Sequence, residues 1–140
     1  MTIFIVVLVV VVVLGIVVLF VPRALMAAKG AKLKGKPAPT PHKASAKRIK
    51  SGARTILYFH TPSCRACQAV DPVVNRLMKR YPGAIFKVNA ATDRKAASAY
   101  GVLGVPYLAF IEGGTLVSTR TGIQKEAPLV EFLSGGAKSA

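Results

Sequence analysis

The sequence TILYFHTPSCRAC at residues 55–67 joins an apolar run to a Cys-x-x-Cys pair, and that pair opens a segment with helical spacing. Cys64 and Cys67 are the only two cysteines of the chain. A helix start carries partial positive charge and unpaired N–H groups, which stabilise a thiolate at the first cysteine. Two intervening residues let the second cysteine turn back on a mixed disulfide formed at the first. The spacing therefore predicts a redox pair that switches between dithiol and disulfide, with Cys64 as the attacking thiolate.

Metal binding is the competing interpretation of these two cysteines. Tetrahedral zinc needs four ligands, and only His42 and His60 are present to complete the set. His42 lies in a Pro-rich segment outside the expected fold, so we expect neither a metal site nor an organic cofactor. A carrier that holds Cu(I) between the two thiolates is a further, minor alternative.

Beyond residue 53, apolar runs alternate with turn residues in the order strand, helix, strand, helix, and then a hairpin of two strands and a closing helix. Strands are expected at 55–60, 84–89, 105–111 and 115–121, and helices at 64–81, 93–100 and 124–133. Strand–helix–strand units favour parallel pairing, whereas a hairpin adds an antiparallel strand. The pattern predicts an α/β domain with a mixed sheet and helices on its faces.

The chain begins with a long apolar segment. Residues 3–21 are apolar apart from Gly15, and roughly 19 residues at ~1.5 Å each span about 28 Å, close to the thickness of a bilayer core. No basic residue precedes this segment, and it is longer than the ~7–15-residue apolar part of a secretory signal peptide. We therefore expect an uncleaved transmembrane anchor over residues 1–22, with a cleaved signal peptide as the alternative.

The net charge of +15 is concentrated just after this segment. Ten Lys or Arg and no Asp or Glu lie between residues 22 and 54. We expect residues 23–52 to be a flexible basic linker that contacts anionic lipid head groups, and residues 53–140 to be the folded domain. Basic residues after a first span place the C-terminal side of that span in the cytoplasm. The basic segment has no aromatic residue to stack on bases, so nucleic-acid binding is not expected.

Three motifs together resemble the thioredoxin family. The first is Cys64-x-x-Cys67 with Pro72 five residues beyond it, the second is YGVLGVP at residues 100–106, and the third is FIEGG at residues 110–114, followed by Gly122 and the closing helix. The resemblance covers almost all of residues 53–134 and implies a thioredoxin-like fold. The family's usual extra N-terminal strand and helix have no convincing counterpart in residues 22–52. We therefore expect a four-stranded mixed sheet flanked by helices.

The resemblance implies roles for several residues around the pair. Pro106 should form a cis peptide bond beside the cysteines, and the backbone of Val105 should pair with an incoming extended peptide. Family members that act as general reductants usually have Gly-Pro between the cysteines, where this chain has Arg65 and an alanine. A guanidinium near the thiolate should lower the pKa of Cys64. The alternative is an exposed arginine that merely fits the turn.

Tyr58 is a second departure from the family's pattern. It occupies the position, six residues before Cys64, where many thioredoxins keep a buried Asp that exchanges protons with the second cysteine. A tyrosine hydroxyl has a pKa near 10 and is a poor base at neutral pH. We expect Tyr58 to be a core residue, which leaves the proton of Cys67 to water or makes exchange slow. His60, at the end of the same strand, either acts electrostatically or simply packs or faces solvent.

We therefore expect a monomeric, single-pass, membrane-anchored thiol–disulfide oxidoreductase that acts on protein thiols and disulfides near the membrane. The charge asymmetry favours a cytoplasmic domain. Many anchored members of the family work outside the cytoplasm, so a periplasmic or extracytoplasmic domain is the alternative. A second hypothesis is a redox-inactive adaptor that binds a partner through the Pro106 face, although an adaptor does not need both cysteines.

Overall fold

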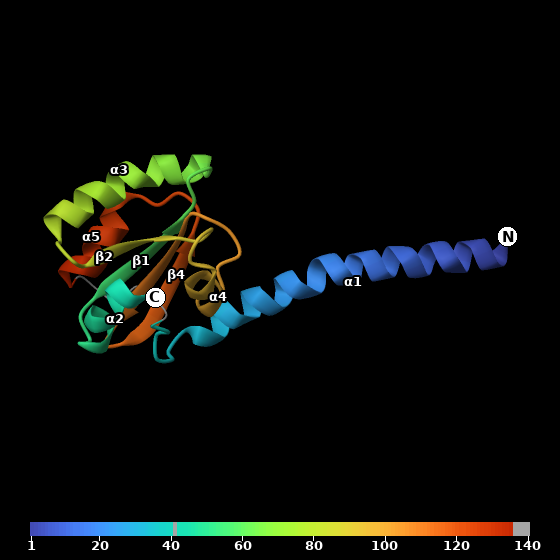
Figure 1. The fold of residues 1–140 in the computed structure, drawn as a ribbon, viewed down its shortest axis with the longest axis horizontal. Helices are drawn as coiled ribbons and strands as arrows, with labels where there is room; N and C mark the ends of the chain where they lie inside the picture. The colour runs from blue at the N-terminus through green and yellow to red at the C-terminus, as the bar shows by residue number, and fades with distance from the viewer. Residues whose placement is uncertain (41, 136–140) are drawn as a thin grey trace.

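The computed structural model describes residues 1–40 and 42–135, in which a long helix projects from an α/β domain (Figure 1). The elements are α1 (Thr2–Leu33), α2 (Lys43–Lys50), β1 (Thr55–His60), α3 (Arg65–Arg80), β2 (Ile85–Asn89), α4 (Arg94–Ala99), β3 (Tyr107–Glu112), β4 (Thr115–Thr121) and α5 (Glu126–Ser134). All four strands and all three helices expected beyond residue 53 are present. The last five residues of the expected domain lie outside the described residues.

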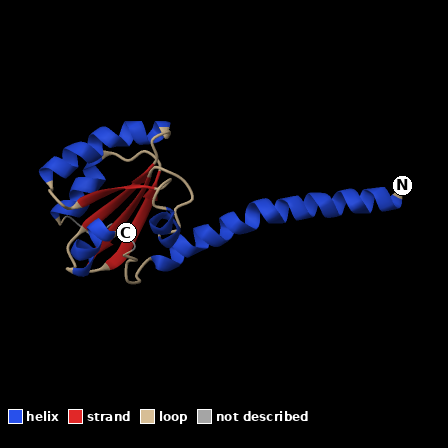
Figure 2. Cartoon of the chain, in the orientation of Figure 1, coloured by secondary structure: helices blue, strands red, loops and turns tan. Residues whose placement is uncertain are grey.

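The four strands form one mixed sheet in the order β2-β1-β3-β4. β1 pairs in parallel with β2 and antiparallel with β3, and β4 pairs antiparallel with β3. Helices lie on both faces of this sheet (Figure 2). The predicted four-stranded mixed sheet flanked by helices is confirmed.

Each face of the sheet contributes to its own buried cluster, because successive side chains of a strand point to opposite faces. Ile56 and Tyr58 of β1 pack with apolar residues of α3 and α5. Leu57 and Phe59 pack on the other face, with α4 and with Ile49 of α2. β1 therefore lies at the centre of the fold with both of its faces covered, and its carboxyl end leads directly into the cysteine pair.

The segment expected to be a flexible linker differs from that expectation. α1 continues to Leu33, and the next few residues pair with the edge of β4 through Gly35 N–H to Leu116 O (2.8 Å), Leu116 N–H to Lys36 O (3.1 Å) and Ala38 N–H to Gly114 O (2.8 Å). The Tyr100 hydroxyl donates to the Pro39 carbonyl. These backbone contacts, together with the burial of Ala38 and Ile49, attach the segment to the domain.

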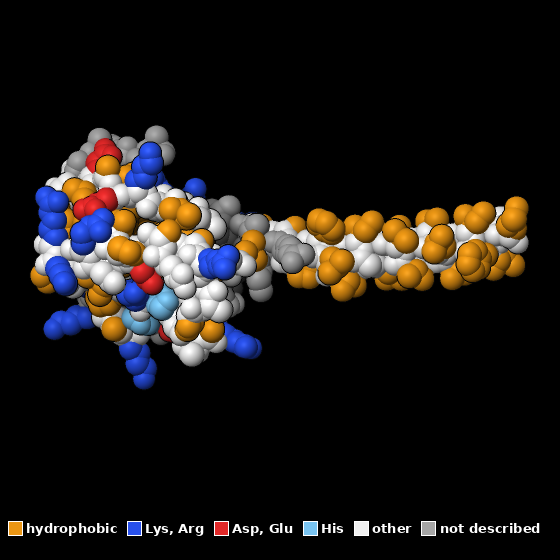
Figure 3. Space-filling view, turned by 90° about the horizontal axis from the view of Figure 1, so that it is seen from above, with side chains coloured by type: hydrophobic (Ala, Val, Ile, Leu, Met, Phe, Trp, Pro, Cys, Tyr) orange, Lys and Arg blue, Asp and Glu red, His pale blue; other side chains and the backbone are white. Residues whose placement is uncertain are grey.

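The first part of α1, Thr2–Pro22, is long and apolar enough to cross a membrane, with a mean hydropathy of 3.8 and no burial inside the structure. Hydrophobic side chains cover this part of the helix on the sides seen in Figure 3, and the basic side chains drawn there lie on the domain. A signal sequence near the N-terminus would share these properties. The helix therefore suggests a single-pass membrane protein without showing its orientation.

Candidate active site

The two cysteines lie where β1 gives way to α3, and they are joined by a disulfide with their Cα atoms 5.2 Å apart. Cys64 is the N-cap of α3, and its Sγ accepts the Cys67 backbone N–H at 3.1 Å. Cys64 is partly exposed, whereas Cys67 is buried with 2% of its surface exposed. An incoming sulfur can therefore reach Cys64, while Cys67 lies behind it.

Pro106 and Val105 precede β3, and the peptide bond between them is cis, as the resemblance implies. A mainly apolar groove lies beside them and extends to Thr61, which follows β1 and whose carbonyl accepts the Cys64 N–H at 3.2 Å. The groove is lined by Thr61, Ala91, Val102, Leu103, Gly104 and Val105, among others. Leu103 is 51% exposed. The expected peptide-binding residue Val105 therefore shares a groove with the loop that leads into the cysteines.

Arg65 is the first residue of α3 and is exposed. It directly follows Cys64 in the chain, but it takes part in none of the three salt bridges found among the described residues. Its exposure fits an arginine that tolerates the turn as well as one that acts on the thiolate, so its role stays a prediction.

Tyr58 is fully buried, as expected for a core residue, and it also contacts the second cysteine. Its hydroxyl donates a hydrogen bond to the Cys67 carbonyl at 3.3 Å. Burial, with the nearby Asp71 carboxylate as a second cause, raises the pKa of Tyr58 above its usual value. Tyr58 therefore stays protonated at neutral pH and is a donor at this site.

Sequence reasoning missed an ion pair on this side of the sheet. The Nζ of Lys87 lies 2.9 Å from Oδ1 of Asp71, and it also lies over the Tyr58 ring, 5.8 Å from its centroid. Lys87 of β2 is the register partner of Tyr58 in β1, so both side chains point towards α3. The Cys67-x-x-x-Asp71 spacing was the available signal, because residues four apart share one helix face.

His60 stacks on Tyr58 with the ring centroids 5.5 Å apart. Burial and then the Lys87 charge lower the pKa of His60. His60 is therefore uncharged at neutral pH, which argues against the electrostatic role considered for a protonated ring and favours a packing role.

His42 lies on the other side of the sheet from the cysteines, edge-on to Phe86 and 3.2 Å from the Ser45 hydroxyl. Within residues 1–40 and 42–135, no group of three or more His, Cys, Asp or Glu side chains lies close enough together to hold a metal ion. The only sulfur ligands of the cysteine type in the chain are the two joined in the disulfide.

The chain is similar to proteins of known sequence and of known structure. The family model described as Thioredoxin matches residues 39–135. Thioredoxin 1 of Nostoc sp. is 31% identical over 87 residues, which cover 61% of this chain and 81% of that protein. Thioredoxin M2, chloroplastic, of Arabidopsis thaliana is 29% identical, and the chain spans about half of its length (47%). The solved structure of Fasciola hepatica thioredoxin has 27% identity and a TM-score of 0.56, covering 65% of this chain and 86% of that one.

Proposed function

Because the chain belongs to the thioredoxin family, we propose that it is a membrane-anchored thiol–disulfide oxidoreductase acting on proteins held close to the membrane. Thioredoxins act on protein thiols and disulfides, and a Cys-x-x-Cys pair at disulfide distance indicates that activity in this chain. The observation that carries the proposal is the difference between the cysteines. Cys64 is partly exposed at a helix start, and Cys67 is buried within reach of it.

The reaction proceeds by two exchanges at Cys64 Sγ. The Cys64 thiolate attacks a substrate disulfide, forms a bond to one substrate sulfur and releases the other as a thiolate. The Cys67 thiolate then attacks Cys64 Sγ, forms the Cys64–Cys67 bond and releases the first substrate sulfur as a thiolate. The substrate ends as a dithiol and the chain as the disulfide that the structure contains. The same steps in reverse oxidise a substrate dithiol.

The groove beside Val105 and Pro106 supports an extended peptide as the substrate. It is open, mainly apolar and continuous with the loop that holds Cys64. Backbone groups next to Pro106 supply pairing that does not depend on substrate sequence, whereas the apolar lining favours small apolar side chains. A substrate segment that lies along this groove presents its disulfide to the partly exposed sulfur.

The apolar part of α1 supports anchoring in a membrane, which would restrict the substrates to those near its surface. The basic residues after it favour a cytoplasmic domain and contact with anionic lipid on that leaflet. Reduction of substrate disulfides is the corresponding direction, because the cytoplasm keeps thiols reduced. An extracytoplasmic domain would instead suit oxidation.

The test is disulfide exchange by the full chain in detergent, with matched single-cysteine variants. We expect turnover of a protein disulfide at the expense of dithiothreitol, and no turnover by Cys64→Ser. Cys67→Ser should accumulate mixed disulfides that reductant releases, because Cys64 still attacks and nothing resolves the product. If neither the wild-type chain turns over substrate nor Cys67→Ser traps it, the chain is an adaptor and the proposal fails.

The reduction potential of the pair tests the direction of electron flow. Equilibration of the full chain with glutathione should give a value near about −270 mV for a reductant like thioredoxin. A value nearer about −120 mV would mark an oxidant and would favour the extracytoplasmic orientation.

A further inference from the structure

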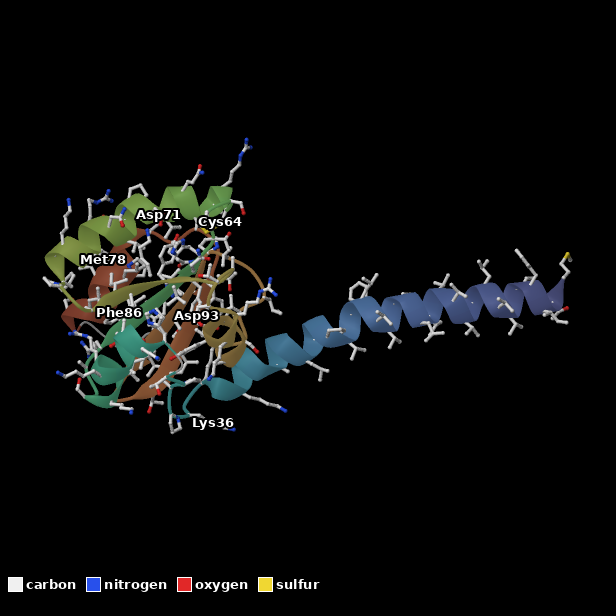
Figure 4. The ribbon with its side chains drawn as sticks, viewed as in Figure 1. Lys36, Cys64, Asp71, Met78, Phe86 and Asp93 are labelled. Carbon is white, nitrogen blue, oxygen red and sulfur yellow. A yellow bond between two sulfur atoms is a disulfide. The ribbon has the colours of Figure 1, made fainter. Side chains whose placement is uncertain are left out.

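A buried carboxylate oxygen lies one helical turn beyond the second cysteine. Asp71 follows Cys67 by four residues in α3, so the two side chains leave the same face of the helix with Cβ atoms about 5–6 Å apart. The Asp71 side chain is 34% exposed, but its Oδ1 is buried. Figure 4 labels Asp71 and Cys64 along α3, on its side towards the sheet.

An ion pair with Lys87 holds this carboxylate in place. Lys87 lies 2.9 Å from Oδ1, and its side chain is only 28% exposed, which fits the rule that buried charges are paired. The titratable groups near Asp71 are Lys87 of β2 and Tyr58 and His60 of β1, and helical spacing puts Cys67 on the same face of α3. Lys87 pairs with the Asp71 carboxylate, and the Tyr58 hydroxyl beneath it donates a hydrogen bond to the carbonyl of Cys67, so this layer of side chains reaches the second cysteine.

Of the other four acidic residues of the chain, three have partners away from the cysteines and one is exposed to solvent. Asp93 caps α4 by accepting the Ala96 N–H at 3.0 Å. Glu112 pairs with Arg54, Glu126 pairs with Arg76, and Glu131 is exposed on α5. Asp71 is therefore the acidic residue that shares a helix face with Cys67.

Cys67 needs such a group when the mixed disulfide is resolved. It is 2% exposed, and burial disfavours a thiolate. Tyr58, although it contacts Cys67, has a raised pKa and cannot accept a proton at neutral pH. A carboxylate four residues away on the same helix face has the lone pairs to accept one.

We propose that Asp71 accepts the thiol proton of Cys67 during resolution, with Lys87 holding the carboxylate in position; this inference rests on the proposed function. The proton moves from Cys67 Sγ to Asp71, and the thiolate so formed attacks Cys64 Sγ. The Cys64–Cys67 bond forms as the bond between Cys64 and the substrate sulfur breaks. The substrate sulfur leaves with the electron pair as a thiolate, and Asp71 later loses its proton to solvent.

The test isolates the resolving step. The reduced full chain in detergent is mixed with one equivalent of 5,5′-dithiobis(2-nitrobenzoate), and release of thionitrobenzoate is followed by stopped flow. The first release reports attack by Cys64 and depends on reagent concentration. The second is the attack by Cys67, is independent of concentration and should be missing in Cys67→Ser. Rates are measured from about pH 5.5 to pH 9, across the range in which thiols ionise.

The Asp71→Asn variant should slow the second phase at least about tenfold near pH 6, since a positioned base contributes this much or more. The deficit should shrink as pH rises and Cys67 ionises without help. The first phase should be unchanged. Glu126→Gln, which removes the same charge from a surface ion pair far from the cysteines in the sequence, is the matched control and should leave both phases unchanged.

A purely electrostatic role for Asp71 predicts the opposite sign. Removing the carboxylate would then leave the Lys87 charge unopposed, lower the pKa of Cys67 and make the second phase faster at low pH. That outcome overturns the proposal, and so does an unchanged dependence of the second-phase rate on pH in Asp71→Asn. In either case, normal turnover of a protein disulfide would leave the proposed function standing. The proposal is also overturned if the second phase slows at low pH in His60→Gln but not in Asp71→Asn.

Asp71→Asn leaves Lys87 without its partner, so the double variant Asp71→Asn/Lys87→Gln tests the same proton transfer without an unpaired lysine charge. It removes both charges and should show the same low-pH loss in the second phase. Lys87→Gln alone keeps the carboxylate and should retain more low-pH activity than the double variant. Equal rates for these two variants would contradict proton transfer to Asp71.

Discussion

Cys64 and Cys67 are three residues apart, and yet the helix start gives them different chemistry. Cys64 Sγ accepts the Cys67 N–H at 3.1 Å, and such donors at a helix N-terminus stabilise negative charge on sulfur. Cys67 is one turn inside and buried, where a thiolate is disfavoured. The nucleophile is therefore ready before substrate arrives, whereas the resolving thiol has to be activated in place.

The Tyr58 hydroxyl should contribute to stability through its contact with Cys67. Tyr58→Phe removes the hydrogen bond to the Cys67 carbonyl and keeps the ring in the core, so the free energy of unfolding should fall by about 1 kcal/mol. Urea unfolding of the full chain in detergent, followed by circular dichroism, measures the change. Tyr81→Phe is the control on a partly exposed ring, and an equal loss there would contradict the assignment.

His60 should make the domain less stable in mildly acidic solution. Its pKa is lowered in the folded chain, so between that value and the unfolded value of about 6.5 the unfolded state binds more protons. Stability therefore rises with pH through this window, and the same stability is lost as pH falls from the unfolded value to the folded one. His60→Gln should flatten this part of the profile of melting temperature against pH. His42→Gln is the matched control, and a flattening there instead would contradict the prediction.

Among single residues, the sequence predicted the cysteine pair but not a role for Asp71. The pair is a local pattern, because two residues at helix-start spacing carry the chemistry by themselves. The role inferred for Asp71 depends on its ion pair with Lys87. Lys87 lies on β2, and the parallel register of β1 and β2 brings it beneath α3. Helical spacing alone places Asp71 on the face of Cys67 but does not show that this face is turned inward at that residue.

At the scale of elements, the strands and helices of the domain followed from apolar periodicity and turn residues. The attachment of residues 35–38 to the edge at β4 did not, because backbone hydrogen bonds along a sheet edge leave no pattern in the side chains. A Lys- and Pro-rich composition is typical of a linker, and prolines are also tolerated at sheet edges. Two buried side chains, Ala38 in this stretch and Ile49 in α2, distinguish the attached part of the chain from a free linker.

The burial of Ile49 gives a direct test of that attachment. Ile49 is 2% exposed between α2 and the sheet, so Ile49→Ala should lower the free energy of unfolding by about 2–4 kcal/mol. Thermal unfolding of the full chain in detergent measures it. Lys47→Ala, at an exposed position of the same helix, should have little effect. Equal and small effects of both changes would mean that residues 43–50 behave as a free linker.

At the scale of the whole molecule, the attachment also shortens the reach of the active site. α1 continues for eleven residues beyond Pro22, about 16 Å at the rise of an α-helix, and a short turn then leads into the pairing with β4. If Thr2–Pro22 spans a bilayer, little free chain is left between the membrane and the domain. The cysteine pair would then reach only those substrates that lie close to the membrane surface.

This limited reach should make exchange depend on where the substrate is held. With the full chain reconstituted in vesicles, a disulfide peptide with a lipid anchor in the same vesicles should react about a hundredfold faster than the same peptide in separate vesicles, because anchoring raises its effective concentration. Release of the peptide thiol measures both rates. A water-soluble form of the peptide, added to either vesicle mixture, should react at the same rate in both. Equal rates for the anchored peptide in shared and separate vesicles would mean that the apolar helix does not hold the domain at the membrane.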